Sequence, residues 1–531
     1  MTLMTLKWRV SFLMVALLMV CGVISAQSSA IKIVYGLTLS VSGFDPHINQ
    51  SSELGIVLRQ VYDTLVYHDP TTDEFVAGLA ESWEISPDGL VYTFKLRQGV
   101  LFHDGTTFNA QAVAANLDRI VDPALSSQKA KLLLGTYTSY EVVDEFTIRL
   151  NLSAPYSPLL DSLAQVYLGI ASPTALQTYA SDPVLYQFHQ IGTGPFIFVE
   201  YLPEDHLTLR RNPAYAWGPT FYDVAGNVEE VEFRFYTDPA TRLLALQSGE
   251  VQIMGEILPT NARTIGSDSS VVLEPVTIPG QPMQFYFNTA KSPTDRLEFR
   301  QALILAANRT AIIESVFQGF SPVAWSPLTS ATRFYDASLF GAYNFNTVES
   351  LRLLDGIGFT DSNNDGIREA NGEPIRITLV QPPWGLVPQV AQLLKDQWRD
   401  IGIETTIVAV PGFTGLLDEV STGNYNLVEF ESSGLDPALL NARFKSGVPG
   451  NWTGFASADL DSLLDQATAT TDNIQRQALY NQIQTAIMQQ ALILPIRDIV
   501  NINAHSQAIT GLQYDSYGWF PLLYGVSYSQ P

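Results

Sequence analysis

Hydrophobic and polar residues alternate strictly over residues 80–96 and then change to a helical period. Trp83 and Ile85 stand at every second position before a turn sequence, Pro87-Asp88-Gly89. The alternation resumes at Tyr92, Phe94 and Leu96. A period of two on both sides of a Pro/Gly turn predicts a β-hairpin. After Asn109, a predicted N-cap, apolar residues recur at i, i+4, i+7 and i+8, which predicts a helix over Val113–Val121.

The same two periods predict the remaining elements. Strands are expected at Ile31–Tyr35, Tyr140–Val143, Thr147–Leu152, Phe285–Thr289 and Glu404–Val410. Helices are expected at Glu53–Tyr62, Ala240–Val251, Arg296–Phe317, Leu386–Ile401, Leu460–Ala467 and Ile474–Gln489. Gly402 separates a helix from a strand, and this succession predicts an αβ unit in a largely parallel sheet.

Length and charge limit the class of protein. A chain of 531 residues is too long for one core, so two or three domains are expected. The 29 basic residues are outnumbered by 53 acidic ones, for a net charge of −24, which is the wrong sign for a nucleic-acid binder.

The first 26 residues have the pattern of a secretory signal. Lys7 and Arg9 precede an apolar run, Val10–Val20, and Ser25-Ala26 forms a small-residue cleavage site. Cleavage there removes two positive charges. The only cysteine, Cys21, allows an alternative in which it is lipidated, but Met19-Val20 is a poor match to the small residues expected before a lipidated cysteine. No later stretch is long and apolar enough to predict a membrane span.

The stretch Ala80–Ala110 closely resembles the signature region of family 5 extracellular solute-binding proteins, the peptide- and nickel-type receptors of ABC importers. Tyr62–Val66, Gly192–Phe196 and Arg210–Tyr215 continue the resemblance, which extends over residues 31–500. It implies an α/β, periplasmic-binding-protein-like two-lobed fold of the large class II type, with an additional α+β lobe.

The resemblance also implies an arrangement of lobes and a function. Lobe I is expected to combine residues 31–62, 191–284 and 491–531, with lobe II at 63–190 and lobe III at 285–490. The chain would cross between lobes near residues 285 and 490 and form a hinge. An oligopeptide or similar-sized solute would be captured between the lobes and delivered to a membrane permease by a monomeric periplasmic or cell-surface protein, without a cofactor. An oligosaccharide receptor and a secreted glycoside hydrolase remain as alternatives.

The charged peptide anchors of the family are not found in this sequence. In its peptide receptors an aspartate four residues before a proline binds the peptide ammonium group. Counted from Pro437, that position holds Ser433, and the family's tryptophan falls at Phe430. The segment Gln381–Gly385 lacks the arginine that binds the carboxylate in dipeptide receptors. Asp436, Glu429 or Glu431 would have to substitute for the missing anchors. Their absence argues against a free peptide and leaves room for a neutral or cationic solute, including an oligosaccharide.

Aromatic residues near these motifs complete the predicted ligand site. They either stack on a ligand or belong to the core. The predicted ligand-binding residues are Tyr35, Phe44, Trp384, Phe430, Ser433, Asp436 and Trp452.

The sequence gives little support for metal binding, catalysis or phosphate binding. Asp361–Gly366 resembles the start of a calcium loop, but Gly372 stands where the bidentate glutamate is required, so an Asx-type turn is favoured. The histidines have no metal-ligand spacing, and no Gly-x-Ser-x-Gly sequence occurs. Gly192–Pro195 lacks the lysine of a phosphate-binding loop and is expected to be a turn entering a strand. No catalytic residue and no metal ligand is therefore predicted.

Overall fold

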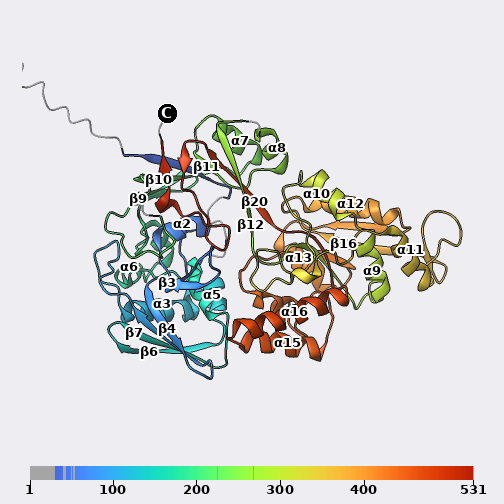
Figure 1. The fold of residues 1–531 in the computed structure, drawn as a ribbon, viewed down its shortest axis with the longest axis horizontal. Helices are drawn as coiled ribbons and strands as arrows, with labels where there is room; N and C mark the ends of the chain where they lie inside the picture. The colour runs from blue at the N-terminus through green and yellow to red at the C-terminus, as the bar shows by residue number, and fades with distance from the viewer. Residues whose placement is uncertain are drawn as a thin grey trace, which may run out of the picture.

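The computed structural model describes residues 30–39, 43–48, 51, 54–223, 225–266 and 268–529. The predicted signal and Cys21 lie outside these ranges. The chain forms two bodies that lie side by side, one containing the N-terminal half and the C-terminal tail, the other the segment between them (Figure 1). Within the described ranges, every helix is too short or too polar to cross a membrane.

The first body is built on a seven-stranded mixed sheet with the order β12-β20-β11-β1-β10-β9-β8. Its strands are β1 (Lys32–Leu37), β8 (Phe196–Leu202), β9 (His206–Arg211), β10 (Glu230–Phe235), β11 (Ile253–Met254), β12 (Val271–Thr277) and β20 (Val500–Ser506). Its helices are α2 (Leu54–Val61), α7 (Pro239–Gln247) and α8 (Pro259–Ile265). The stretch Gly192–Pro195 is the predicted turn into β8.

A four-stranded antiparallel sheet, β4-β5-β7-β6, forms the other part of the first body. Its strands are β4 (Ala80–Ile85), β5 (Val91–Leu96), β6 (Tyr137–Asp144) and β7 (Thr147–Leu152), and a separate pair is β2 (Val66–His68) with β3 (Phe75–Ala77). Its helices are α3 (Ala110–Val121), α4 (Lys129–Leu133), α5 (Leu159–Ala164) and α6 (Pro173–Thr178). Both predicted hairpins are confirmed, and Asn109 caps α3 by accepting a hydrogen bond of 3.1 Å from the Ala112 N–H.

The second body contains a five-stranded sheet, β17-β16-β18-β13-β19. Its strands are β13 (Met283–Phe287), β16 (Arg376–Gln381), β17 (Glu404–Ala409), β18 (Leu427–Glu429) and β19 (Ile493–Arg497). The αβ unit at Gly402 is parallel as predicted, because β16 pairs parallel with β17 and β18. The prediction of a largely parallel sheet is wrong, since β13 pairs antiparallel with both β18 and β19.

Helices cover the second sheet: α9 (Leu297–Ala306), α10 (Arg309–Val316), α11 (Thr347–Gly356), α12 (Val387–Arg399), α13 (Phe413–Ser421), α14 (Asn441–Phe444), α15 (Ala458–Ala469) and α16 (Asn473–Gln489). The single helix predicted over Arg296–Phe317 is wrong. The chain is extended at Ala307, and the Asn308 side chain accepts from the Ala311 N–H to begin α10. Asparagine competes with the backbone for hydrogen bonds, so it favours such a cap over a helix interior.

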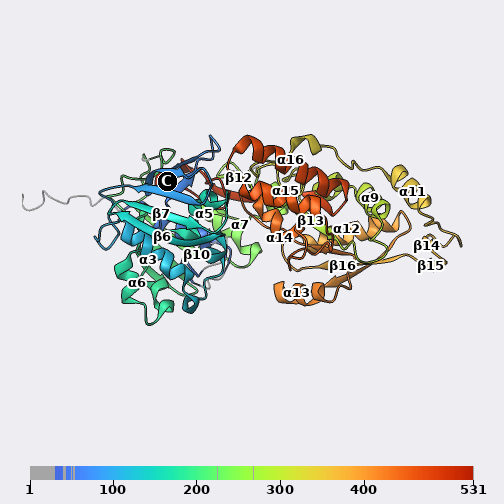
Figure 2. The ribbon, with the colours of Figure 1, turned by 90° about the horizontal axis from the view of Figure 1, so that it is seen from below.

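The chain crosses between the bodies twice, after β12 and after β19 (Figures 1 and 2). The two crossing segments are joined by a 2.8 Å hydrogen bond from Ile278 N to Ile499 O. The expected boundaries at 285 and 491 are therefore displaced, because β13 and β19 both belong to the sheet of the second body. Gly280 lies in the first crossing at φ +131°, and a Cβ there would meet Ser432 O at 2.2 Å, so only glycine fits.

The C-terminal tail returns to the first body, as expected. It contains two short strands, β21 (Ile509–Thr510) and β22 (Ser527–Tyr528), which pair with each other. The Tyr517 hydroxyl donates to Asp161 at 2.8 Å, and Asp515 pairs with Arg59 of α2 at 3.1 Å. The tail thus lies beside α2 and α5 at the border with the second body.

Candidate functional site

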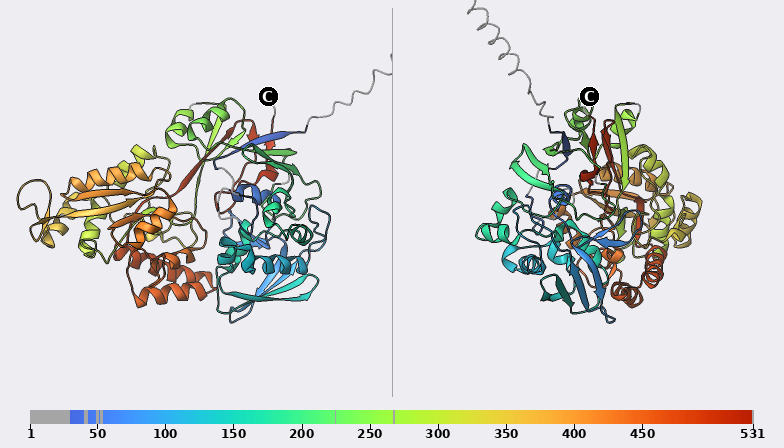
Figure 3. Two further views of the ribbon diagram at one scale, coloured as in Figure 1. Left: turned by 180° about the vertical axis from the view of Figure 1, so that it is seen from behind. Right: turned by 60° about the vertical axis from the view of Figure 1, so that its left-hand side comes forward.

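A cleft of about 510 Å³ lies between the two bodies, within the usual range of ligand pockets, roughly 300–1,000 Å³. The first body contributes residues of α4 and α5, the second contributes residues 432–443, and the C-terminal tail adds three aromatic residues, Tyr517, Trp519 and Phe520. The bodies also touch beyond the cleft, where Ser157 N donates to Thr468 O at 2.9 Å. Figure 3 shows α15 and α16 of the second body against the first.

An aromatic cluster lies beside the cleft in the second body. The ring of Phe430 lies 5.2 Å from that of Trp452, 5.9 Å from that of Phe413 and 6.2 Å from that of Trp384. The guanidinium of Arg443, which lines the cleft, is 4.3 Å from the Phe430 ring centre and 4.6 Å from that of Trp452. Burial lowers the pKa of Arg443 below its ordinary value. Three predicted site residues, Trp384, Phe430 and Trp452, thus lie in one cluster, and Arg443 is stacked near two of them, Phe430 and Trp452.

Lys129 lines the opposite wall of the cleft, at the start of α4. Its ammonium lies 3.7 Å from the centre of the Tyr167 ring, a cation–π distance. Burial lowers the pKa of Lys129 to about 8. An amine with this pKa is mostly charged at neutral pH. The wall of the cleft therefore contains a charged ammonium group that is partly removed from water.

Two carboxylates line the same cleft, and both have partners within the protein. Asp161 accepts from the Tyr517 hydroxyl at 2.8 Å and from Gln165 Nε2 at 3.1 Å. Asp436 accepts from Arg476 Nη2 at 2.9 Å and from the Ala438 N–H at 2.9 Å. Burial, together with the charge of Asp436, raises the pKa of Asp161 to about 6.

A second polar group lies at the ends of the three neighbouring strands β18, β13 and β19. Glu429 is fully buried and accepts from Trp384 Nε1 at 3.0 Å. Burial raises the pKa of Glu429 well above its ordinary value, and the negative charge of Glu431 adds to this effect. Arg497 acts in the opposite direction on both carboxyl groups. Burial and mutual repulsion therefore both favour the protonated form of this pair over the ionised one.

The remaining predicted site residues are found in different surroundings. Tyr35 and Phe44 are both buried, Tyr35 against Phe233 at 5.5 Å and Phe44 against Tyr201 at 5.0 Å, so they belong to the core of the first body. Ser433 lines the cleft and pairs with Gly280 of the crossing segment.

Asp436 lines the cleft but has a structural role. Its carboxylate begins a short 3₁₀ helix, Pro437–Leu440, and forms a buried ion pair. The interpretation of Asp436 as a free ligand anchor is therefore corrected: one of its oxygens is already bound by Arg476 and by a backbone N–H.

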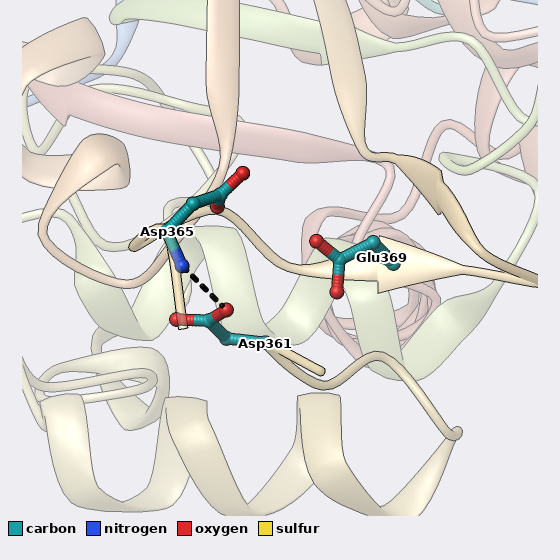
Figure 4. Close-up of side chains that lie close together, drawn as sticks. All are labelled: Asp361, Asp365 and Glu369. Atoms are coloured by element: carbon teal, nitrogen blue, oxygen red, sulfur yellow. Dashed lines mark hydrogen bonds between the residues drawn. The ribbon is translucent and has the colours of Figure 1, made fainter. Parts of the chain in front are cut away.

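The loop Asp361–Gly366 is an Asx-type turn, as favoured from the sequence. Asp361 accepts from the Asp365 N–H at 3.2 Å (Figure 4). It also accepts from the Gly366 N–H at 3.0 Å, while Glu369 accepts from the Ser362 N–H at 2.7 Å. The carboxylates of Asp361, Asp365 and Glu369 lie close together. Their hydrogen bonds to loop amides account for this proximity without an ion.

Sequence reasoning missed Lys129, Arg443, Asp161 and the role of Trp519. Lys129 and Asp161 lie outside every motif that carried the resemblance, and Arg443 follows the last of them. The aromatic composition of the tail was visible in the sequence, but its position in the cleft depends on the return of the chain to the first body.

Comparison with known proteins gives the family. Residues 74–444 match the family described as bacterial extracellular solute-binding proteins, family 5 Middle. The glutathione-binding protein GsiB of Shigella flexneri serotype 5b is 26% identical over 456 residues, which cover 82% of each chain.

Solved structures share the fold. NikA from Brucella suis, in complex with Fe(III)-EDTA, aligns with a TM-score of 0.84 at 24% identity, covering 94% of this chain and all of that one. DppA from Helicobacter pylori, in complex with the peptide STSA, aligns with a TM-score of 0.75 at 23% identity, covering 94% and 99% of the two chains. With its two bodies, its cleft and a family match over most of its length, the protein belongs to family 5 of the bacterial extracellular solute-binding proteins, and it is a solute-binding receptor for ABC import.

Proposed function

We propose that this receptor captures a short oligopeptide or a solute of similar size in the cleft between its two bodies and delivers it to a membrane permease. The observation that carries the proposal is the cleft itself, which is lined by both bodies and by the C-terminal tail. Its lining combines aromatic rings with a few charged groups, as expected for a pocket that orients a ligand with polar ends. The name of the relative GsiB, a glutathione-binding protein, supports a peptide ligand.

Capture is proposed to work by movement of the bodies about the two crossing segments. The segments are short and lie side by side, joined by the bond from Ile278 N to Ile499 O, and such paired connections form hinges in two-lobed receptors. A bound solute would contact both walls of the cleft and so favour the closed arrangement.

We also propose that the protein binds its solute without transforming it. A glycoside hydrolase needs two carboxyl groups free to act as acid and base or nucleophile on the scissile bond. In the cleft, Asp161 accepts from a tyrosine and a glutamine, and Asp436 is held by Arg476 and a backbone N–H. These contacts support structural roles for both groups.

A thermal-shift panel tests the proposal. The purified protein is heated with glutathione, with Ala-Ala-Ala, with an oligosaccharide and with a nickel–histidine chelate. A peptide at 100 times its dissociation constant should stabilise the protein by about 2.7 kcal/mol, because it binds the folded state alone. This corresponds to an upward shift of the melting temperature by a few degrees.

Other outcomes identify the alternatives. A shift with the oligosaccharide and none with the peptides would make the protein a sugar receptor. Recovery of a cleaved ligand after incubation would show an enzyme. Either result contradicts the proposed peptide receptor.

Family 5 receptors act outside the cytoplasm, and we propose that this one is secreted by cleavage after Ala26 and acts as a monomer. Intact-mass measurement and light scattering on the exported protein test both points. The expected result is an unlipidated chain beginning at Gln27, with the mass of one copy in solution. A chain beginning at a lipidated Cys21 would instead show membrane anchoring.

A further inference from the structure

We infer that the ligand carries carboxylate groups and that Lys129 and Arg443, from opposite walls of the cleft, bind them. This inference rests on the proposed function and specifies the substrate class of the same cleft. It differs from the expectation raised by the sequence, where the missing family anchors left room for a neutral or cationic solute.

Lys129 is placed to receive an anion. It lines the cleft, and its ammonium lies over the Tyr167 ring at 3.7 Å. Within the described residues its charge has no carboxylate partner, and burial is the only cause that lowers its pKa. A partly dehydrated ammonium without a counter-ion gains more from an approaching anion than a fully hydrated one does.

Arg443 offers a second, geometrically different contact. Its guanidinium is stacked near Phe430 and Trp452, and it makes a long hydrogen bond from Nη1 to Gly450 O at 3.4 Å. No carboxylate of the described chain is paired with it. Stacking holds the planar donor fork in one orientation, which suits a bidentate contact to a carboxylate.

The acidic groups of the cleft do not cancel these two cations. Asp436 is neutralised by Arg476, whose side chain is almost fully buried. Asp161 is bound by Tyr517 and Gln165, and with a pKa of about 6 it is mostly ionised at pH 7, so it offsets only one of the two positive charges. The remaining charge on the walls is therefore positive, although the whole chain is strongly acidic.

Buried polar atoms of the same walls also favour a polar ligand over a purely apolar one. Trp519 and Asn441 both line the cleft. The Nε1 atom of Trp519 and the Oδ1 atom of Asn441 are buried and have no hydrogen-bond partner among the described residues. A donor and an acceptor of this kind match the amide groups of a peptide. Two cations, a donor and an acceptor thus match a small peptide acid.

Calorimetric titration with matched ligands tests the inference. Glutathione, which has two carboxylates, is compared with its diethyl ester, and Ala-Ala-Ala with its C-terminal amide. Loss of a charge-assisted hydrogen bond is expected to weaken binding by about tenfold to a hundredfold. The acids should therefore bind more tightly than their neutral forms by at least this factor.

Substitutions assign the effect to the two residues. Lys129→Met retains the contact with Tyr167 and removes the charge, and Arg443→Met does the same beside Phe430. Each should weaken binding of the acid by about tenfold or more and leave the affinity of the neutral form unchanged. Two control variants also remove one positive charge each and should change neither affinity. Lys131 lies on the same helix as Lys129 but is exposed, which makes Lys131→Met the first control. Lys445 is close to Arg443 in sequence and is paired with Asp465, which makes Lys445→Met the second.

Two results would overturn the inference. If acids and their neutral forms bind equally well, carboxylates are not recognised, although the receptor function stands. If acids are preferred but Lys129→Met and Arg443→Met bind them as the wild type does, other residues hold the carboxylates.

Arg443→Lys provides a folding check, because it retains the charge and should regain part of the affinity. Failure of every peptide, acid or neutral, to bind contradicts the proposed function as well.

Discussion

Replacing Asp436 with alanine is expected to lower the free energy of unfolding by about 3–5 kcal/mol. The substitution leaves the Arg476 guanidinium buried without its counter-ion. The side chains of Arg476 and Asp436 are only 3% and 5% exposed, and their atoms lie 2.9 Å apart. In the wild type, burial opposes the charge on Arg476, but the nearby Asp436 carboxylate raises its pKa above the ordinary value. The variant loses this compensation, but a guanidinium is not deprotonated near neutral pH, so its charge stays buried without a counter-ion. Calorimetry should show the melting temperature of the second body lowered by roughly 10 °C.

Matched variants separate this effect from ligand binding. Asp418→Asn removes an exposed carboxylate from the same body and should change stability by no more than about 0.5 kcal/mol. The double variant Asp436→Leu with Arg476→Met should be more stable than Asp436→Ala, since no buried charge is left unpaired. If Asp436→Asn instead retains the wild-type melting temperature and weakens ligand binding, Asp436 is a ligand anchor after all.

Arg59→Met is expected to cost about 3–5 kcal/mol in the first body at pH 7.5, again by leaving a buried charge unpaired. Arg59 is 1% exposed and joins α2 to the C-terminal tail through Asp515 at 3.1 Å and to α5 through Ala164 O at 3.0 Å. The tail supplies Tyr517, Trp519 and Phe520 to the cleft. The variant should therefore weaken ligand binding as well as lower the melting temperature.

The pH dependence of this loss identifies its cause. Burial raises the pKa of Asp515 to about 6, above the value of an unfolded aspartate, even though Arg59 opposes the shift. A carboxyl group with a raised folded-state pKa binds more protons when folded, so its contribution to stability increases as the pH falls toward 5. Without Arg59 the pKa of Asp515 in the folded state rises further, so the stability gained on lowering the pH becomes larger. The difference between variant and wild type should thus shrink at pH 5, and adding Asp515→Asn should recover part of the loss at pH 7.5. An equal loss at both pH values would attribute it to packing alone.

Local pattern was enough to predict most elements of this fold. The hairpin β4–β5, the cap of α3 by Asn109 and the αβ unit around Gly402 depend on residues close together in the sequence, and each is found as expected. The break at Ala307 was missed because Ala307 and Asn308 are compatible with both a helix and a cap. There the choice is supported by a distant residue, Gln397, whose side chain accepts from the Asn308 N–H at 2.9 Å.

The surroundings of the predicted site residues were foreseen only in part, for the same reason. Trp384, Phe430 and Trp452 form one cluster, but Tyr35 and Phe44 are core residues, and aromatic side chains in a sequence do not show which of these two positions they occupy. The partner of Asp436 is 40 residues away on α16, so its ion pair was invisible to motif reasoning.

By itself, the sequence determined most of the secondary structure, because periodicity and turn residues are local properties of the chain. Its motifs carried the resemblance to the family, and that resemblance implied the two-lobed architecture. Only the tertiary structure decided the chemistry of the cleft. Lys129 and Arg443 are more than 300 positions apart in the sequence and belong to different bodies, yet they line one cavity. Which charges are left without a partner depends on every group that surrounds them, and that is settled only when the chain has folded.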